Sequence, residues 1–464
     1  MNVLFIMTDT LRADYLGCYG NEWIQTPNID NLAAESAVFT GCYSEGQPTL
    51  PARRALMTGR RTFPWKDDRT LPGDRLNMQP GWQPINDEYW TISEILRDNG
   101  YWTGFIADTA VMFKPGMNFH RGFDTFEYVR GHAADPCEFP LSADPHLKKD
   151  RVSASEVRRH RRSCYQKFFE TLGAEGEYFS GVTLGKAGHW LMNHRNVEKT
   201  FLWVDTFDPH EPWFPPKDCL VLYKREELLS APWSLSDEEE CRTEDAIVEM
   251  RAAYAGEVTK VDRWVGSLLE DLEKSGRAKD TIMVFHSDHG VPLGHGGVSH
   301  KRGKSMFQCQ SRNPLMIRHP EGLGAGTRID ALCYNMDVMP TLLELVGVEA
   351  PEALEARSLV PLMRGETETL RDCVTSGFNA WVMYRDEAYL MFQQFSGEGT
   401  VLIDLTADPR EEKNIAEGND GLINELRKRL EAECGGLPKK PPIYWDWPPK
   451  PETRSLFPRV FWPR

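Results

Sequence analysis

Short apolar runs recur along the chain, with helix-like segments between them. The runs are nearly continuous in hydrophobic residues, which is typical of strands buried on both faces of a parallel sheet. They occupy residues 3–7, 102–107, 200–204 and 281–286. Residues 91–99 and 249–275 instead show the period of amphipathic helices. This alternation predicts an α/β domain with a large, mostly parallel or mixed sheet sandwiched by helices.

Polar side chains directly follow three of these apolar runs. Asp9 comes after the first run, residues 205–210 follow the third, and residues 287–290 follow the fourth. In α/β proteins the carboxyl ends of parallel strands meet at one edge of the sheet, where ligands bind. The sequence therefore predicts that these polar groups gather into a site at that edge.

The α/β pattern stops near residues 350–365, where short strand-like segments begin. A helical segment follows at residues 421–433, and the change of pattern predicts a smaller α+β domain. We expect a catalytic domain over residues 1–360 and a second domain over residues 361–464. The end of the chain is rich in Trp and Pro, and we expect an ordered arm there, because exposed aromatic side chains at that density would be costly.

The formal net charge of −15 narrows the choice of partners. It argues against nucleic acid or an anionic membrane surface as the main partner. No apolar run approaches the roughly 18 residues that a membrane span requires. A small anionic substrate would need a local cluster of positive groups to enter so negative a molecule.

The cysteines and the first residues bear on the compartment. The ten cysteines include no Cys-x-x-Cys pair, which favours free thiols in a reducing environment over a disulfide framework or a zinc ribbon. The opening Met-Asn-Val-Leu-Phe-Ile-Met lacks the basic start, longer apolar stretch and small-residue cleavage site of a signal peptide. We therefore expect a cytoplasmic protein and leave open whether it forms a homo-oligomer.

One segment places a hydroxyl and a guanidinium at the start of a predicted helix. Thr49 opens the sequence Thr-Leu-Pro-Ala-Arg, and Arg53 lies one turn further in. A hydroxyl at a helix N-terminus faces backbone N–H groups and the positive end of the helix dipole, which suits an anion or an alkoxide. The arginine can hold that group and a substrate's oxygens through its fork of donors. The simpler interpretation is that Thr49 caps the helix, and both interpretations stay open here.

Further motifs occur in a fixed order over nearly the whole chain. Residues 49–60 are similar to a C/S-x-P-S/A-R motif followed by a short helix and L/M-T-G-R. The other landmarks are residues 9–14, 18–20, 26–33, 288–290, 314–318, 336–343, 402–405 and 408–414. In this order they resemble the landmarks of the sulfatase family, a branch of the alkaline-phosphatase-like superfamily. The resemblance implies an alkaline-phosphatase-like fold and a metal-dependent hydrolase of ester bonds.

The resemblance also implies a set of metal ligands. The matching positions are Asp9, Thr49, Asp288 and His289, and Thr10 stays open as an additional ligand. Family members with two carboxylates at the first position and Asn or Gln at the last tend to hold calcium. Here Thr10 replaces one carboxylate and His289 supplies an imidazole nitrogen. Softer ligands favour one manganese or zinc ion, with calcium and magnesium left open.

Three positions take catalytic roles from the resemblance. His210 occupies the segment that supplies the family's histidine beside the leaving group, and Lys301 has the spacing of the active-site lysine. Lys304 is a competitor for the lysine role. A histidine and a lysine here can protonate the departing oxygen and neutralise the charge of the transferring group. Arg53 and Lys301 are expected to clamp the anion.

Thr49 departs from the family in a way that changes the expected chemistry. The family oxidises a Cys or Ser at this position to formylglycine, a route closed to threonine. Thr49 can instead attack directly, activated by the metal, and water must then resolve the covalent intermediate. We expect phosphate or phosphonate esters to be favoured over sulfate esters, because a sulfo-threonine would be harder to clear.

The sequence departs from the family pattern at two more places, and it leaves two alternative functions open. The family's G-K-W-H substrate segment is missing at residues 107–114, and the ligands of a second metal are not found, which favours a one-metal site. One alternative is a sulfatase proper, acting on organic sulfate through Thr49 or metal-bound water. The other is a catalytically silent relative that only binds an anion, although Asp9, Arg53, Asp288, His289 and Lys301 are all retained.

Overall fold

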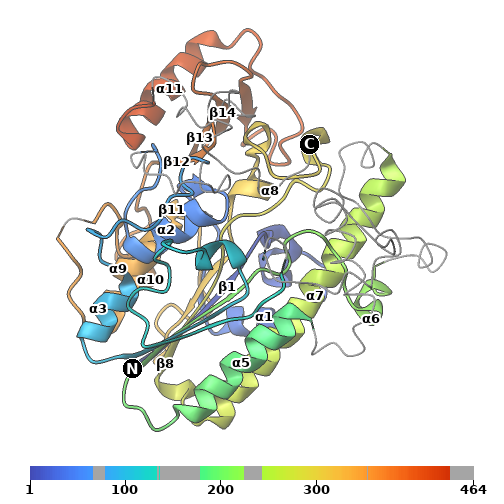
Figure 1. Cartoon of the computed structure of the whole chain (residues 1–464). Coiled ribbons are helices and arrows are strands. Elements are labelled where there is room, and N and C mark those ends of the chain that lie inside the picture. Colours follow the sequence, from blue (N-terminus) through green and yellow to red (C-terminus); the bar gives the residue numbers. More distant parts are fainter. Residues whose placement is uncertain (66–78, 133–134, 136–177, 224–242, 353, 439–464) are drawn as a thin grey trace, which may run out of the picture.

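A computed structural model describes residues 1–65, 79–132, 135, 178–223, 243–352 and 354–438 (Figure 1). Its centre is an eight-stranded sheet with the order β10-β2-β9-β8-β1-β7-β5-β6. The four central strands named by the apolar runs are β1 (Asn2–Thr8), β5 (Trp102–Ala107), β7 (Thr200–Thr206) and β8 (Thr281–Ser287). The others are β2 (Ala37–Phe39), β6 (Thr125–Tyr128), β9 (Leu315–Arg318) and β10 (Arg328–Ile329).

The sheet is parallel except for one strand. β1 pairs in parallel with both β7 and β8, and β5 pairs in parallel with β7 and β6. β9 runs antiparallel to its neighbours β8 and β2. Every residue of β1, β7 and β8 is buried, and the stacked rings of Phe5 and Trp203, 4.1 Å apart, join two of these strands on one face. The expected mixed, mostly parallel sheet is confirmed.

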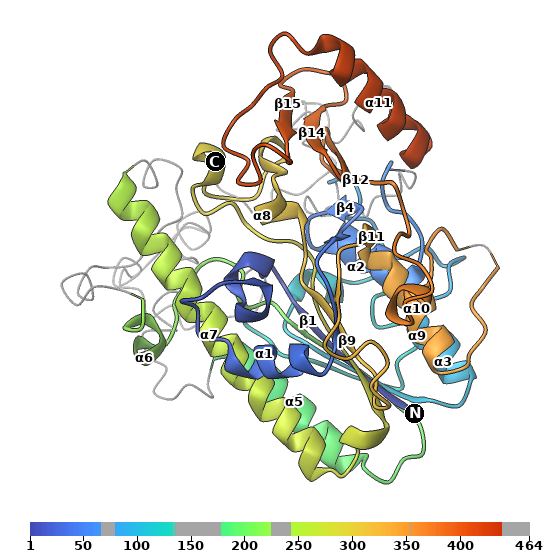
Figure 2. The same cartoon turned by 180° about the vertical axis from the view of Figure 1, so that it is seen from behind.

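Helices cover both faces of this sheet, as Figures 1 and 2 show from opposite sides. One face packs against α1 (Pro27–Ala34), α5 (Phe179–Asn193) and α7 (Glu244–Lys274). The other packs against α2 (Leu50–Thr58), α3 (Ile92–Asp98), α9 (Val338–Leu345) and α10 (Val360–Met363). The helix predicted at residues 91–99 is α3, which begins with a capping box between Thr91 and Glu94. Short helices α6 (Lys217–Leu220) and α8 (Gln308–Ser311) lie in connecting segments.

A second, five-stranded sheet occupies the C-terminal part, with the order β15-β14-β13-β12-β4. β12 (Cys373–Phe378), β13 (Trp381–Asp386), β14 (Tyr389–Gln394) and β15 (Val401–Asp404) form an antiparallel meander, and α11 (Asp420–Cys434) packs on it. A two-stranded ribbon, β3 (Cys42–Tyr43) with β11 (Cys333–Tyr334), lies apart from both sheets.

The fifth strand of the C-terminal sheet comes from the beginning of the chain. β4 (Gly46–Gln47) pairs in parallel with β12, so a segment just before Thr49 belongs to the C-terminal sheet. The division into two domains at residue 360 therefore stays a prediction. β4 belongs to the first domain by sequence and to the C-terminal sheet by pairing. The expected Trp- and Pro-rich arm falls on residues 439–464, outside the described residues. Within the described part, no helix combines the length and apolar character that crossing a membrane requires.

Candidate active site

Four buried side chains mark the carboxyl edge of the large sheet. Asp9 follows β1, Asp205 lies near the end of β7, and Asp288 and His289 follow β8. All four are fully buried. The ends of these three strands are level, because the last residue of β1 pairs with residues at the same place in β7 and β8. The edge expected from the sequence is therefore where these groups meet.

Asp9, Asp288 and His289 form a group that fits a metal ion. One potential ligand atom of each residue lies within 4.8 Å of the other two. His289 Nδ1 donates to the carbonyl of Gly290 at 2.9 Å, which leaves the lone pair on Nε2. That buried Nε2 has no hydrogen-bond partner among the described residues, and it faces Asp288 at 3.4 Å and Asp9 at 3.8 Å. A divalent cation would satisfy this atom and both carboxylates.

The pKa values in this group follow from burial and crowding. Burial lowers the pKa of His289 to about 3, so its ring is neutral and can act as a ligand. Burial and the neighbouring charge of Asp9 raise the pKa of Asp288 well above its usual range. Asp9 itself has a lowered pKa, because Arg53 and nearby cationic groups outweigh the effect of burial. Two carboxylates this close cannot both ionise easily without an added positive charge.

Arg53 connects the carboxylates of the three strand ends. Its Nε and Nη2 bind Asp205 at 2.9 and 2.8 Å in a two-pronged pair. Its Nη1 donates to Asp9 at 2.9 Å and to Asp288 at 2.6 Å. The side chain is fully buried. In this structure the donors of Arg53 face carboxylates, and the expected contact with a bound anion stays a prediction.

Thr49 stands next to this network at the start of α2. Arg53 Nη1 also donates to the Thr49 carbonyl at 3.3 Å, so Thr49 adjoins the Asp9–Asp288 pair. Its backbone has φ 35° and ψ −83°, a conformation that threonine rarely adopts and that carries strain. Its side chain forms no capping hydrogen bond to α2. The interpretation of Thr49 as a plain helix cap therefore fails, and its hydroxyl has no hydrogen-bond partner among the described residues.

Thr10 ties the two carboxylates together. Its hydroxyl donates to Asp9 Oδ1 at 2.6 Å, and its backbone N–H donates to Asp288 Oδ1 at 3.0 Å. It too has a positive φ, of 67°. The structure explains the position of Thr10 through these two bonds, and its role as an additional ligand stays open.

A second group of side chains faces the first. Lys301 Nζ donates to His210 Nε2 at 2.8 Å and to Thr10 Oγ1 at 3.4 Å. The same Nζ contacts both carboxylate oxygens of Glu211 at 2.9 Å. Lys304, the competing lysine, is exposed and contacts none of these groups. The lysine beside Thr10 and His210 is therefore Lys301.

Electrostatics fixes the protonation of this second group. Burial, with the charge of Lys301, lowers the pKa of His210 to about 4. The neutral ring of His210 donates a hydrogen bond from Nδ1 to the carbonyl of Glu211 and accepts a hydrogen bond from Lys301 Nζ at Nε2. Glu211 has a lowered pKa, because His210 and Lys301 outweigh the effect of its burial. The free site therefore holds a lysine–glutamate ion pair beside a neutral histidine.

The loop that carries His210 and Glu211 is anchored from below. Asp208 accepts from Lys260 of α7 at 2.7 Å and is bonded to His132 Nε2 at 2.9 Å. All three side chains are buried. Lys260 and His132 outweigh the effect of burial and lower the pKa of Asp208. This network ties the segment after β7, which carries His210 and Glu211, to α7.

The sequence motifs missed two of these contacts. Asp205 was visible as a polar residue at a strand end, the same signal that picked out Asp9, but its pairing with Arg53 depends on side-chain direction. Glu211 has no comparable signal, because it follows His210 in a loop whose conformation the pattern does not determine. The structure shows both in contact with predicted site residues.

Comparisons with known proteins identify the family of the chain. Residues 1–348 match the family model described as Sulfatase. Residues 295–435 match the model described as N-sulphoglucosamine sulphohydrolase, C-terminal. The chain is 26% identical to an arylsulfatase of Clostridium perfringens, over 94% of this chain and 94% of that protein.

Solved structures share the fold. A phosphonate monoester hydrolase of Agrobacterium radiobacter superposes with a TM-score of 0.71 at 21% identity, covering 93% of this chain and 96% of that one. A protein solved with its substrate D-glucosamine-2-N,6-O-disulfate superposes with a TM-score of 0.69 at 22% identity, covering 94% and 98%. These two likenesses concern the fold alone. The family model, which spans most of the chain, shows that the chain belongs to the sulfatase family of ester-hydrolysing enzymes.

Proposed function

We propose that this enzyme hydrolyses small anionic esters of phosphate, phosphonate or sulfate, with Thr49 as the nucleophile and phosphorus esters favoured. The observation that carries the proposal is the backbone conformation of Thr49 and its position beside the proposed metal ligands. It is buried, held at a positive φ, makes no capping bond, and adjoins Asp9 and Asp288 through Arg53. Strain that a structure retains at one residue of a site is often part of that site's function.

The proposed reaction has two steps. Thr49 Oγ forms a bond to phosphorus while the bond from phosphorus to the leaving oxygen breaks, which gives a phosphorylated threonine and an alcohol. Water then attacks phosphorus, the bond to Thr49 Oγ breaks, and the hydroxyl regains its proton. A sulfur ester would leave a sulfo-threonine that water clears less readily, which is why phosphorus esters are favoured.

Asp9, Asp288 and His289 are the residues that would hold the divalent ion, with Thr49 in the proposed ligand set. When bound, the ion supplies a Lewis acid that lowers the pKa of a coordinated hydroxyl and offsets negative charge. Arg53 keeps Asp9 and Asp288 in position for this. The imidazole of His289 beside two carboxylates favours manganese or zinc, and calcium and magnesium remain open.

The leaving oxygen needs a proton, and His210 with Lys301 can provide one. Lys301 carries a proton that it shares with the neutral His210 Nε2 over 2.8 Å. A departing alkoxide beside this pair would take that proton directly or through the imidazole. The side chains of both residues are partly open to solvent, at 11% for Lys301 and 15% for His210, so a substrate can reach them.

Glu211 limits the negative charge that a substrate's ester group can carry in this site. Its carboxylate neutralises Lys301 in the free enzyme, and Arg53 is already surrounded by carboxylates. A site with so little spare positive charge favours an ester group with one negative charge over one with two. Phosphate diesters, phosphonate monoesters and sulfate monoesters carry one charge, whereas phosphate monoesters carry nearly two near neutral pH.

The second candidate is sulfate-ester hydrolysis proper. It is favoured by the similarity over the full length to the arylsulfatase of Clostridium perfringens. The structural likeness to a phosphonate monoester hydrolase supports the first candidate at the level of the fold. A silent anion-binding role is the weakest of the three, because the proposed metal ligands stay together in one group.

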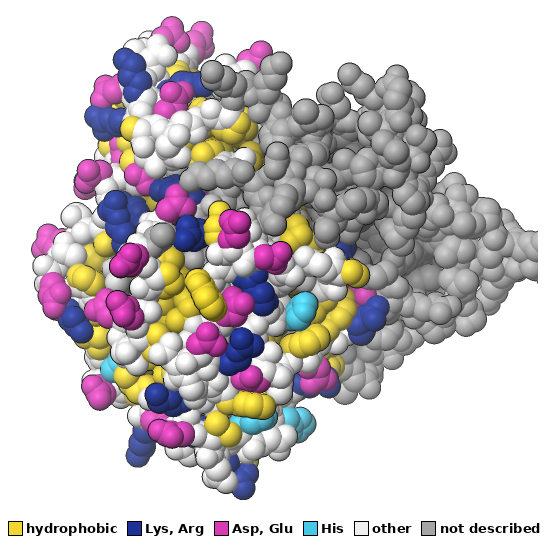
Figure 3. Space-filling model, turned by 60° about the vertical axis from the view of Figure 1, so that its left-hand side comes forward, with side chains coloured by type: hydrophobic (Ala, Val, Ile, Leu, Met, Phe, Trp, Pro, Cys, Tyr) yellow, Lys and Arg dark blue, Asp and Glu magenta, His cyan; other side chains and the backbone are white. Residues whose placement is uncertain are grey.

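The remaining expectations concern partners and compartment. On the face drawn in Figure 3, acidic and basic side chains are interspersed, which supports a small-molecule substrate over nucleic acid. Seven cysteines of the described residues are free, which supports the proposed reducing, cytoplasmic environment.

The metal assignment is tested by removing His289. We expect His289→Ala to lower the affinity for the bound divalent ion more than about a hundredfold, because deleting a direct ligand exceeds the 10–100-fold cost of losing a supporting bond. The matched control is His286→Gln, because His286 is equally buried and bonds only to the Pro314 carbonyl. Metal content would be measured by elemental analysis after dialysis. Equal metal content in the His289→Ala variant and the parent would contradict the assignment.

The nucleophile is tested by two substitutions of Thr49. Thr49→Ala should lower kcat by several orders of magnitude while metal content and folding are kept, because the attacking oxygen is lost. Thr49→Ser should retain part of the activity. The control is Thr58→Ala in the same helix, whose hydroxyl only bonds to the Arg54 carbonyl. An alanine variant that turns over at the parent's rate would sink the nucleophile role.

The charge argument is tested by Glu211→Gln with a panel of aryl esters. The panel contains bis(p-nitrophenyl) phosphate, a p-nitrophenyl phosphonate, p-nitrophenyl sulfate and p-nitrophenyl phosphate. We expect the parent to prefer the singly charged phosphorus esters. Glu211→Gln should raise kcat/KM for p-nitrophenyl phosphate relative to the diester by about tenfold, because one nearby negative charge is removed.

The exposed Glu35→Gln serves as the control for this change. An unchanged ratio in Glu211→Gln would contradict the role given to Glu211. A parent enzyme that prefers p-nitrophenyl sulfate would overturn the phosphorus preference and leave the family assignment in place.

A further inference from the structure

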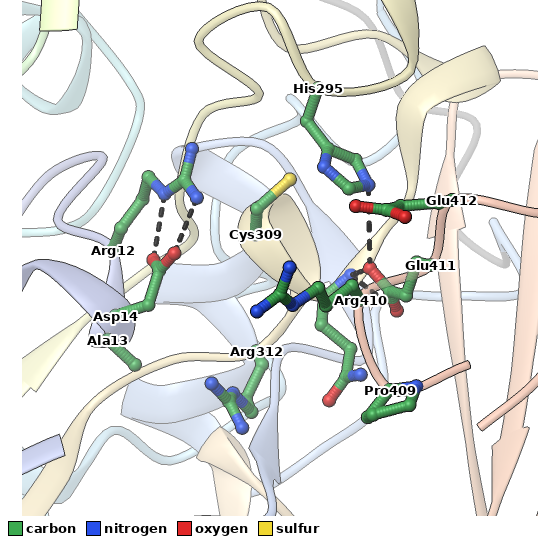
Figure 4. A pocket seen from close by; sticks show the side chains of 11 residues that line it. Arg12, Ala13, Asp14, His295, Cys309, Arg312, Pro409, Arg410, Glu411 and Glu412 are labelled. Atoms are coloured by element: carbon green, nitrogen blue, oxygen red, sulfur yellow. Dashed lines mark hydrogen bonds and ion pairs between the residues drawn. The ribbon is translucent and has the colours of Figure 1, made fainter. Parts of the chain in front are cut away.

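A polar cavity lies beside the active site without sharing any of its proposed residues. Its volume is about 400 Å³. Four segments enclose it: residues 12–14, His295, residues 308–312 around α8, and residues 409–412 of the C-terminal part. Figure 4 shows these side chains arranged around one space. The first segment lies just beyond Asp9, so the cavity adjoins the metal site from outside.

One arginine of the cavity is fully engaged. Arg12 binds Asp14 through Nε at 2.8 Å and Nη2 at 2.6 Å. Its Nη1 donates to the carbonyls of Val291 and Pro292 at 3.1 and 3.0 Å. Arg12 and Asp14 therefore cancel one another's charge and form a rigid wall between the Asp9 loop and the His289 loop.

Two other arginines have no such partner. Neither Arg312 nor Arg410 forms a side-chain hydrogen bond or ion pair with any described residue, and Arg312 Nε is buried without one. In Figure 4 the Arg410 guanidinium extends toward the centre of the view, and that of Arg312 lies below it. A buried guanidinium donor without an acceptor is costly, and a ligand with oxygen acceptors would satisfy it.

The acidic residues of the cavity do not remove this positive charge. Glu411 is buried, and its carboxylate accepts the backbone N–H of Gln308 at 3.0 and 3.2 Å. Burial raises the pKa of Glu411 to about 7, so much of it carries a proton near neutral pH. Glu412 is exposed at the rim. The two guanidinium groups, which have no partner in the described part of the chain, thus share the cavity with one acidic side chain at the rim and one that is partly neutral.

We propose that this cavity is a second anion site, which binds a small molecule through an oxyanion group held by Arg312 and Arg410. The planar forks of two arginines match carboxylate, phosphate and sulfate groups. Such local positive charge stands out in a chain of net charge −15. Two sources supply such an oxyanion: the inorganic product of the neighbouring active site and the carboxylate of a separate metabolite. The site itself does not depend on the chemistry proposed for Thr49.

Calorimetric titration of the metal-loaded enzyme with inorganic phosphate and with succinate tests the proposal. Arg410→Gln and Arg312→Gln should each weaken binding at this site about tenfold, as expected for the loss of a charge-assisted bond. Arg410 is exposed, so its variant should fold even if the half-buried Arg312 does not tolerate substitution. Arg364→Gln, an exposed arginine elsewhere, is the control and should bind like the parent.

Structures of crystals soaked in each anion distinguish binding in this cavity from binding at the metal site, where phosphate is also expected. Density between Arg312 and Arg410 for phosphate alone would identify an inorganic oxyanion, and density for succinate alone would identify a carboxylate ligand. Either result supports the site. Density for neither anion, or titrations of both variants that match the parent, would overturn it.

Discussion

The burial of three carboxylates around one arginine is the constraint on which the site depends. Asp9, Asp205 and Asp288 are all fully buried, and Arg53 is the one basic side chain of the described residues that lies within hydrogen-bond distance of all three. Removing an ion from water costs several kcal/mol even after the surroundings relax. One guanidinium leaves about two negative charges to be balanced. The raised pKa of Asp288 relieves part of that excess, and a divalent cation held with His289 would relieve the rest.

The fold brings the three carboxylates and Arg53 together at one edge of the sheet. Three parallel strands end level and deliver one carboxylate each, while α2 brings Arg53 into the space between them. The strand before Thr49 is fixed by a different sheet, since β4 pairs with β12 of the C-terminal part. Thr49 is thus held between the metal group of one sheet and the backbone of another. This double anchoring accounts for how a strained threonine keeps its conformation.

The sequence predicted those parts of the structure that depend on local pattern. The four apolar runs became β1, β5, β7 and β8, and the polar residues that follow three of them meet at one edge. The sequence pattern did not predict pairing between strands that lie far apart in the chain. Nothing in the pattern around Gly46 predicts a strand shared with residue 377, because the partner lies more than three hundred positions away.

Side-chain direction explains the other gaps. The contacts of Arg53 with three carboxylates were not predicted, since the pattern places this residue on α2 but does not set its rotamer, and its expected contact with a bound anion stays a prediction. The ion pair between Glu211 and Lys301 joins a loop to a segment ninety residues later, and only the folded chain brings them together. Both cases concern contacts between elements, which periodicity does not encode.

The most direct test of the central claim is to trap the intermediate. Metal-loaded enzyme would be mixed with excess bis(p-nitrophenyl) phosphate, quenched with acid within milliseconds, digested and mapped by mass spectrometry. A direct nucleophile predicts a burst of p-nitrophenol and a phosphoryl ester on Thr49, which disappears as the substrate is consumed. Steady turnover with no burst, and with Thr49 unmodified at every time point, would contradict nucleophilic attack by this residue.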